Sequence, residues 1–237
     1  MKPIFLALDF PNWFQTDTFI KKHQLQGVPV KVGMELFYKE GPIVIEKLKE
    51  NNHPIFLDLK LYDIPTTVKN AMCNLATLGV DVVNVHAFGG REMIHAAKEG
   101  LIQGTSQGLP PKLIAVTVLT SMDTCTLQED LQVKSSINDT VQHLAKLTKD
   151  SGGDGVVCSV HEVPNIKDHC GTDFWTITPG IRLTNTSTND QKRVATPGLA
   201  KEYGTDALVI GRSVTSAIDP REAYQKAEKE WLHVKKA

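Results

Sequence analysis

The sequence predicts an α/β protein built as a single (β/α)8 TIM barrel that spans residues 1–237. About eight short runs rich in apolar and β-branched residues alternate with longer segments of helical periodicity, the pattern of repeated strand–helix units. That number of units in 237 residues fits one barrel. Polar and charged residues also recur where the runs end, and barrels carry their active sites on that side.

The predicted elements follow one another along the whole chain. The strands cover residues 4–9, 29–33, 54–60, 80–87, 113–120, 155–159, 174–181 and 207–212. Amphipathic helices are predicted at residues 42–51, 66–78, 91–101, 138–150 and 219–235. A doubly wound open sheet is the alternative, but its glycine fingerprint is absent, since Gly33 and Gly41 are too far apart and follow the wrong strand.

The composition is that of an ordinary globular protein, with 41% hydrophobic residues, 22% charged residues and a formal net charge of -1. So small a charge creates no field to attract nucleic acid or an anionic membrane, and neither partner is predicted. No apolar run approaches the length of a membrane span, and the N-terminal run meets Asp9 too early for a signal peptide. The four cysteines form no CxxC pair, which indicates free thiols in a reducing, cytoplasmic compartment.

The end of the third predicted strand carries the most informative cluster of charges. Asp58 and Lys60 alternate with leucines and share one strand face, and Asp63 follows just before Pro65, where a helix would begin. The plain alternative is a structural ion pair, with Asp63 or Thr66 as a helix N-cap. Three charges within six positions favour a reaction centre, because buried charges are expensive unless something there uses them.

Lys31 is predicted to join this cluster from the second strand. Both of its neighbours are valines that would face the helices, so the lysine itself would point into the barrel. With Asp58, Lys60 and Asp63 it would form a nearly neutral alternating set that tolerates a low dielectric and holds a lysine ready to deliver a proton. An edge lysine whose charged end reaches solvent is the alternative.

The last two predicted strands end in a pattern typical of a phosphate site. Arg182 closes the run Thr-Pro-Gly-Ile-Arg, and Gly211 and Arg212 close the last strand. Loops after the seventh and eighth strands of barrels often hold phosphate on exposed backbone N–H groups, and arginine adds a planar charged fork. Residues 183–193 between them are polar and long for a barrel loop, which is typical of a lid that orders on ligand binding. A plain surface loop is an equally open alternative on composition alone.

Histidines and cysteines give no sign of a metal site. His86 ends the fourth predicted strand, where a hydrogen-bonded supporting role is expected. His95, His161 and His169 lack the spacing of zinc ligands, and Cys158 is most simply a small core residue.

These residues together resemble a known family. The run Asp58-x-Lys60-x-x-Asp63-Ile64-Pro65-x-Thr67 is similar to the signature of orotidine 5'-phosphate decarboxylase in its bacterial, monofunctional form. The flanking pieces agree in order: Leu-Asp9, Lys31-Val-Gly33, Val-His86-Ala, Thr-Val-Leu-Thr120, Thr-Pro-Gly-Ile-Arg182, Gln191 and Ile-Gly211-Arg212. The resemblance covers nearly the whole chain.

The resemblance implies a homodimer of barrels that converts orotidine 5'-phosphate to UMP and CO2 without metal or cofactor. It implies that Lys60 gives a proton to C6, that Asp58 lies near the departing carboxylate, and that Lys31 pairs with Asp58 and reaches the ribose. Asp63 would enter the site from the partner subunit. Further substrate contacts would come from Asp9 and the partner's Thr67 at the ribose, Thr120 at the pyrimidine, and Arg182, Gln191, Gly211 and Arg212 at the phosphate.

Two alternatives stay open. Barrels that act on 3-keto sugar phosphates share the Asp-x-Lys-x-x-Asp spacing but use magnesium, held by a glutamate at the position of Lys31 here. A lysine at that position would repel the cation, which argues against this reading. A catalytically silent phosphate-binding barrel is the second alternative, and it would be expected to lack one of the four charges.

Overall fold

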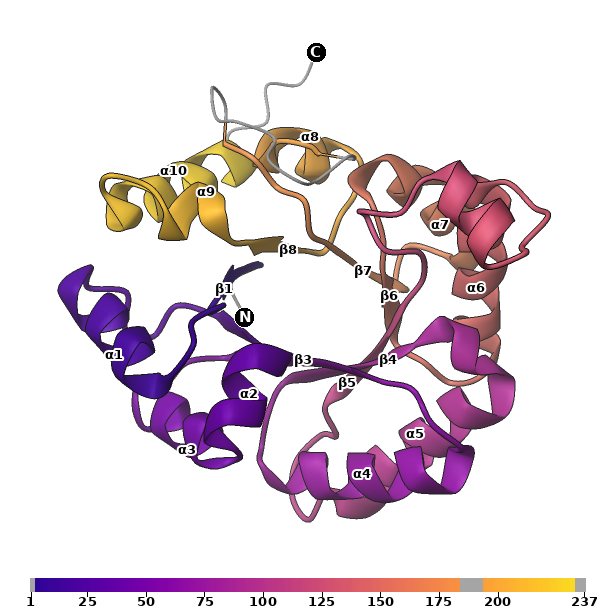
Figure 1. Cartoon of the computed structure of the whole chain (residues 1–237), viewed down its shortest axis with the longest axis horizontal. Helices are drawn as coiled ribbons and strands as arrows, with labels where there is room; N and C mark the ends of the chain where they lie inside the picture. The colour runs from indigo at the N-terminus through magenta and orange to yellow at the C-terminus, as the bar shows by residue number, and fades with distance from the viewer. Residues whose placement is uncertain (1–2, 184–193, 233–237) are drawn as a thin grey trace.

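Eight parallel strands close into one barrel in the computed structural model, which describes residues 3–183 and 194–232. The strands are β1 (Ile4–Ala7), β2 (Val30–Gly33), β3 (Ile55–Leu61), β4 (Val82–His86), β5 (Lys112–Val116), β6 (Gly155–Val157), β7 (Trp175–Thr178) and β8 (Ala207–Ile210). They pair in chain order, and β8 pairs with β1. Figure 1 shows the helices as a ring around the strands. The predicted (β/α)8 barrel is therefore confirmed, and the open sheet is wrong.

The helices follow the strands around the ring. They are α1 (Trp13–Lys22), α2 (Met34–Glu40), α3 (Ile43–Glu50), α4 (Pro65–Thr77), α5 (Gly90–Gly104), α6 (Ile137–Asp150), α7 (Val163–Cys170), α8 (Pro197–Glu202), α9 (Arg212–Thr215) and α10 (Pro220–Leu232). The five predicted helices correspond to α3, α4, α5, α6 and α10. Short 3₁₀ turns follow β4 and β6, and a π-helical segment follows β5.

The apolar core has two parts, one on each side of the strands. The larger part fills the space between the strands and the helices. The smaller part plugs the barrel and consists of Phe5, Phe56, Val82, Ile114, Ile177 and Ala207. Since side chains alternate along a strand, the residues two positions later also face inward, one layer closer to the carboxyl ends. This apolar layer inside the barrel therefore lies directly beneath the residues at the carboxyl ends of the strands.

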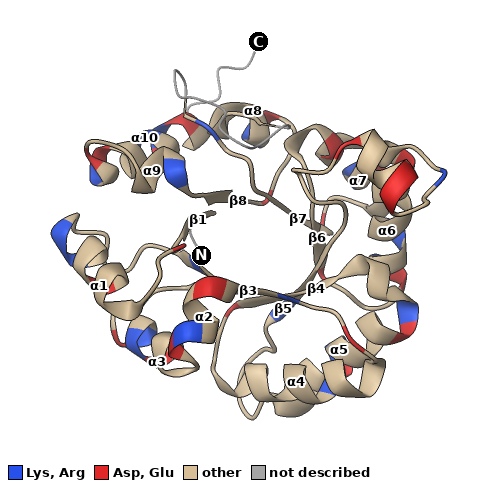
Figure 2. Ribbon diagram, in the orientation of Figure 1, with Lys and Arg blue, Asp and Glu red and all other residues tan. Residues whose placement is uncertain are grey.

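Charged residues of both signs are distributed around the ring of helices. Figure 2 shows residues of both signs scattered over the outer helices, with a few at the inner rim of the barrel. Within the described ranges, no helix combines the length and the apolar character needed to cross a membrane. Cys73, Cys125, Cys158 and Cys170 are free thiols.

Candidate active site

A cavity of about 510 Å³ opens at the carboxyl ends of the strands. The predicted site residues that line it are Asp9, Lys31, Asp58, Lys60, Thr120, Arg182, Gly211 and Arg212. They come from six different strands or the loops that directly follow them. The fold thus brings together residues more than 200 positions apart in the sequence, from Asp9 to Arg212.

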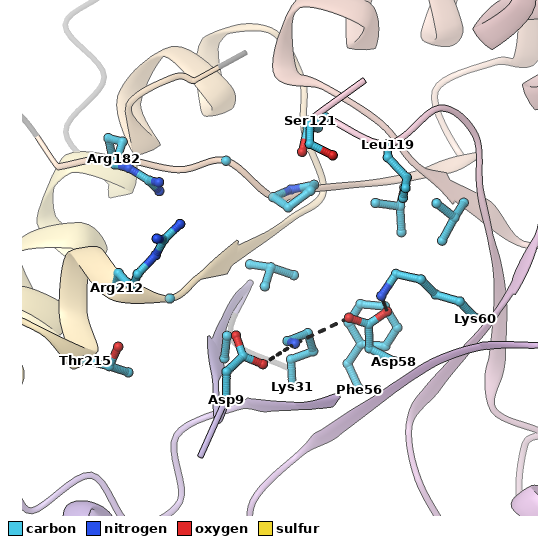
Figure 3. Close-up of a pocket in the computed structure, with 18 of the residues that line it drawn as sticks. Asp9, Lys31, Phe56, Asp58, Lys60, Leu119, Ser121, Arg182, Arg212 and Thr215 are labelled. Carbon is cyan, nitrogen blue, oxygen red and sulfur yellow. Dashed lines mark hydrogen bonds and ion pairs between the residues drawn. The ribbon is translucent and has the colours of Figure 1, made fainter. Parts of the chain in front are cut away.

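Four charged side chains form a row along one wall of the cavity (Figure 3). Lys31 Nζ lies 2.8 Å from Asp9 Oδ1 and 3.4 Å from Asp58 Oδ2. The other oxygen of the same carboxylate, Asp58 Oδ1, lies 2.7 Å from Lys60 Nζ. The signs alternate along the row, so each charge has an opposite charge beside it, which lowers the cost of burial.

The pKa of Lys31 reflects the two carboxylates beside it in the row. Burial alone would lower the pKa of its ammonium, but attraction to Asp58 and Asp9 outweighs burial and raises the pKa above its ordinary value. Lys31 is therefore charged at neutral pH. Gly33 leaves room for the pair, because a Cβ there would lie 3.0 Å from Lys31 Nζ and 3.3 Å from Asp9 Oδ1.

Asp63 is not part of this row within a single chain. Asp63 was predicted to complete the alternating set, but within one chain that place belongs to Asp9. Asp63 is exposed, does not line the cavity, and accepts a hydrogen bond of 2.6 Å from the N–H of Ile64. The plain alternative, with Asp63 or Thr66 as the N-cap of α4, is wrong, since the N-cap residue is Ile64 and no side chain caps that helix.

Strand β3 is irregular at the point where it carries Lys60. The pairing with β4 shifts register between Leu57 and Leu61, and Lys60 has a φ of +52°. A left-handed backbone at a non-glycine residue costs on the order of 1–3 kcal/mol, and inside a buried strand it needs a compensating partner. Regular strand alternation, the stated reason for Asp58 and Lys60 sharing a face, is therefore wrong, although both side chains do reach the cavity.

Asn84 on β4 was missed in the sequence. Its side chain is 1% exposed and bonds both to the carboxylate of Asp58 and to the backbone N–H of Lys60. The available signal was a single polar residue in the middle of the apolar run Val-Val-Asn-Val, two positions before His86. His86 itself does not line the cavity, and burial together with the charge of Lys60 lowers its pKa.

Two arginines face the cavity from the side opposite the charged row. Figure 3 shows the guanidinium groups of Arg182 and Arg212 pointing into the same space. Arg182 is buried and donates from Nη1 to the carbonyl of Ile181 at 3.0 Å, which helps to fix its direction. Gly211 stands immediately before Arg212 at the start of α9. This end of the cavity can bind a dianion through two planar charged groups.

The donor set of the site does not fit a metal ion. The two carboxylates of the cavity wall, Asp9 and Asp58, are both paired with the ammonium group of Lys31. Within residues 3–183 and 194–232, no group of three or more His, Cys, Asp or Glu side chains is arranged to hold a metal.

Comparisons with known proteins agree with this geometry. A family model described as "Orotidine 5'-phosphate decarboxylase / HUMPS family" matches residues 2–227. The chain belongs to this family. It is 52% identical over 230 residues to orotidine 5'-phosphate decarboxylase of Listeria monocytogenes serotype 4b (strain CLIP80459), covering 97% of this chain and 98% of the relative. It is 54% identical over 227 residues to orotidine 5'-phosphate decarboxylase of Bacillus pumilus (strain SAFR-032), covering 95% and 97%.

A solved structure extends the match to three dimensions. The crystal structure of orotidine 5'-phosphate decarboxylase from Lactobacillus acidophilus superposes with a TM-score of 0.89 at 44% identity, covering 98% of this chain and 100% of that one. The resemblance to the orotidine 5'-phosphate decarboxylase family, and with it the prediction of an enzyme of the decarboxylase family, is confirmed.

Three residues of the family motif set are not among the described residues that line the cavity. Asp63 and Thr67 are exposed, on the segment that leads into α4 and on the first turn of that helix. Gln191, and with it most of the predicted lid at 183–193, lies outside the described residues. The structure leaves the roles predicted for these three residues untested.

Proposed function

We propose that this chain converts orotidine 5'-phosphate to UMP and CO2 in pyrimidine biosynthesis. The observation that carries the proposal is the alternating row Asp9–Lys31–Asp58–Lys60 at the mouth of the barrel, facing two arginines. The relatives at 52% and 54% identity carry the name of this decarboxylase, which supports the same reaction here.

Lys60 is the proposed catalytic acid. Loss of CO2 from C6 leaves an electron pair in the plane of the pyrimidine ring, where no π-system can spread it. Without a cofactor, the reaction is assisted by positive charge placed at that carbon in advance. The ammonium of Lys60 supplies the charge and then the proton that forms the C6–H bond of UMP.

Asp58 and Lys31 keep Lys60 in place. The Asp58 carboxylate holds the Lys60 ammonium at 2.7 Å, and Lys31 balances the same carboxylate from the other side. The departing substrate carboxylate would lie near Asp58, and that like-charge contact is relieved as neutral CO2 leaves. Asp9 and Lys31 would bind ribose hydroxyls, and Thr120 would contact the pyrimidine.

Binding of the phosphate fixes the geometry at C6. Arg182, Gly211 and Arg212 would surround the phosphate, with Gln191 on the closing loop. These contacts are remote from the reacting carbon, so their binding energy contributes to orientation and closure rather than to the chemical step directly.

The active site is proposed to be shared across a homodimer. Asp63 and Thr67 would enter the partner subunit's cavity, since they are exposed and do not line the cavity of their own chain. Tyr62 and Ile64, on either side of Asp63, are 64% and 66% exposed in the single chain. Apolar side chains at such exposure beside a polar motif are typical of an interface.

A magnesium-dependent reaction on a 3-keto sugar phosphate is the second candidate. It requires a carboxylate at the strand-two position, and Lys31 there already neutralises Asp9 and Asp58. The residues present do not fit a divalent cation at this place.

The deciding experiment follows the absorbance of orotidine 5'-phosphate with micromolar enzyme and EDTA present. The proposal expects full activity with EDTA, because no step uses a metal. Absence of any decay would end the decarboxylase proposal. Decay abolished by EDTA and restored by Mg²⁺ would favour the metal-dependent candidate.

A further inference from the structure

The irregularity in β3 leaves a backbone donor without a strand partner. Leu57 pairs with Val83 and Leu61 pairs with Val85, so four steps along β3 correspond to two steps along β4. The residues of β3 in this bulge cannot follow the backbone ladder. Lys60 lies within it and has the left-handed φ of +52°. A buried N–H at this position needs another acceptor.

Asn84 lies between Val83 and Val85 on β4, and its side chain supplies that acceptor. Its Oδ1 accepts a hydrogen bond of 2.7 Å from the N–H of Lys60. Because a backbone N–H can only donate, this contact fixes which way the carboxamide is turned. The amide nitrogen Nδ2 then points to Asp58 and donates to its Oδ1 at 2.6 Å.

We propose that Asn84 is a positioning residue for the reaction, acting through both members of the Asp58–Lys60 pair; the proposal rests on the decarboxylase function above. Asp58 Oδ1 accepts from Lys60 Nζ at 2.7 Å and from Asn84 Nδ2 at 2.6 Å. One side chain therefore sets the backbone from which Lys60 extends and the carboxylate that holds the Lys60 ammonium. Asn84 does not itself line the cavity.

A carboxamide meets both requirements at neutral pH, whereas an ionised carboxylate or an apolar side chain does not. Aspartate has the same shape and could accept from the Lys60 N–H, but when ionised it has no donor for Asp58 and would repel it. Leucine of similar size offers neither group. Asn84 is 1% exposed, so water cannot readily take over these bonds, and in this low-dielectric setting a missing partner is expensive.

The test compares Asn84→Asp and Asn84→Ala with wild type, using orotidine 5'-phosphate turnover, UMP binding by calorimetry and thermal unfolding. Misplacing a catalytic group by about 1 Å costs on the order of 100-fold in rate, so both variants should lose about that much kcat at pH 8. KM and UMP affinity should change by less than about threefold, since phosphate and ribose contacts remain.

A pH profile of Asn84→Asp separates positioning from general damage. A carboxyl beside Asp58 has a raised pKa, and when protonated its O–H can donate to Asp58 as the amide did. The ratio of variant to wild-type kcat should therefore rise about tenfold or more from pH 8 to pH 5. The ratio for Asn84→Ala should stay flat, because alanine has no group to titrate.

Thr117→Val is the matched control. Thr117 is 1% exposed on the same barrel, donates one hydrogen bond of 2.9 Å to the carbonyl of Val157, and does not line the cavity. It should lose stability with kcat within about twofold of wild type.

Several results would overturn the positioning role. One is that the Asn84 variants fold and have a kcat close to that of Thr117→Val. Another is that only KM changes. A third is that the ratio of Asn84→Asp to wild-type kcat does not change with pH. Failure of both Asn84 variants to fold would make the residue structural and would also overturn it. An inert wild-type protein defeats the proposed function itself, whereas an active wild type with active Asn84 variants defeats this inference alone.

Discussion

At the scale of single residues, burial has opposite consequences for two basic side chains of this barrel. Lys31 keeps its charge because Asp9 and Asp58 lie within 2.8 and 3.4 Å of its ammonium. His53 is also buried, but among the described residues no carboxylate contributes to its pKa, and its charged form is disfavoured. The contrast follows from the local partners, because burial penalises any charge that is not paired.

His53 makes the stability of the fold sensitive to acid. Its Nδ1 lies 2.6 Å from the carbonyl of Val28, and its Nε2 is buried with no hydrogen-bond partner among the described residues. Burial lowers the pKa of His53 despite the opposing effect of the Val28 hydrogen bond. The unfolded chain therefore binds a proton more readily than the folded one below about pH 6.5.

The expected outcome is a free energy of unfolding that falls as the pH drops from 7 to 5. One such histidine contributes a slope of at most about 1.4 kcal/mol per pH unit. His53→Gln should reduce the slope, while His86, whose pKa is also lowered, maintains part of it. Urea unfolding at several pH values measures this, with the exposed His143→Gln as control. Equal slopes for His53→Gln and wild type would contradict the assignment.

The sequence predicts charged site residues better than neutral ones. Lys31, Asp58 and Lys60 are conspicuous because charges at buried strand ends require an explanation. Asn84 carries no charge, and its importance depends on a register shift and a left-handed backbone at Lys60. Neither feature has a mark in the sequence, since no glycine or proline stands at that point of β3.

At the scale of elements, the contact between α4 and α5 holds the segment that follows the catalytic strand. The two helices lie side by side on the outside of the barrel (Figure 1). Gly100 and Gly104 of α5 face the backbone of Lys69 and Cys73 of α4, so both pairs have the four-residue spacing of one helix face. A Cβ on either glycine would collide with a backbone carbonyl oxygen.

Gly100→Ala should therefore destabilise the fold although alanine favours helix. Overpacking costs roughly 1–3 kcal/mol and exceeds the gain of about 1 kcal/mol in helix propensity. Gly198→Ala in α8 is the matched control, because the nearest atom to its new Cβ is Glu230 O at 3.4 Å. That variant should be neutral or slightly more stable. Urea unfolding distinguishes the two, and a Gly100→Ala protein as stable as the control would show that the helices separate easily.

Strands were predicted more completely than helices for a physical reason. Every strand of the barrel is buried on both sides and reads as a short apolar run. Six of the eight strands end earlier than predicted, as for β5, which stops at Val116 rather than at residue 120, whereas β2 ends as predicted and β3 ends one residue later. Helices α1, α2, α7, α8 and α9 were missed because they are short or weakly patterned. For example, α8 has six residues, and α1 buries only Thr16 and Ile20.

At the scale of the whole molecule, one barrel contains most of the site but not all of it. The charged row, the arginines and Thr120 meet in one cavity, as the alternation of strands and helices predicts for residues at strand ends. Asp63 and Thr67 are exposed and do not line that cavity. A sequence motif does not reveal which subunit a residue serves, so only the three-dimensional arrangement separates these two from Asp58 and Lys60.

Subunit mixing tests whether Asp63 serves the partner's site. Lys60→Ala and Asp63→Asn proteins should each be nearly inactive, and Lys60→Ala should still bind UMP because the phosphate contacts remain. In a twofold-symmetric dimer, a mixed pair has one site with both changes and one site with neither. After full exchange of an equal mixture, half of the dimers are mixed, so about a quarter of wild-type activity should return.

The control for this experiment is a mixture of Lys60→Ala with Asp58→Asn. Both residues belong to the row of the same chain, 2.7 Å apart, so every site in the mixed dimer keeps one damaged row. No activity should return in that mixture, although the subunits exchange equally well. Exchange is followed by native mass spectrometry of differently tagged subunits. The shared site is contradicted if exchange is complete and the mixture of Lys60→Ala with Asp63→Asn stays inactive. Each site would then be built within one chain, and Asp63 would act in its own subunit.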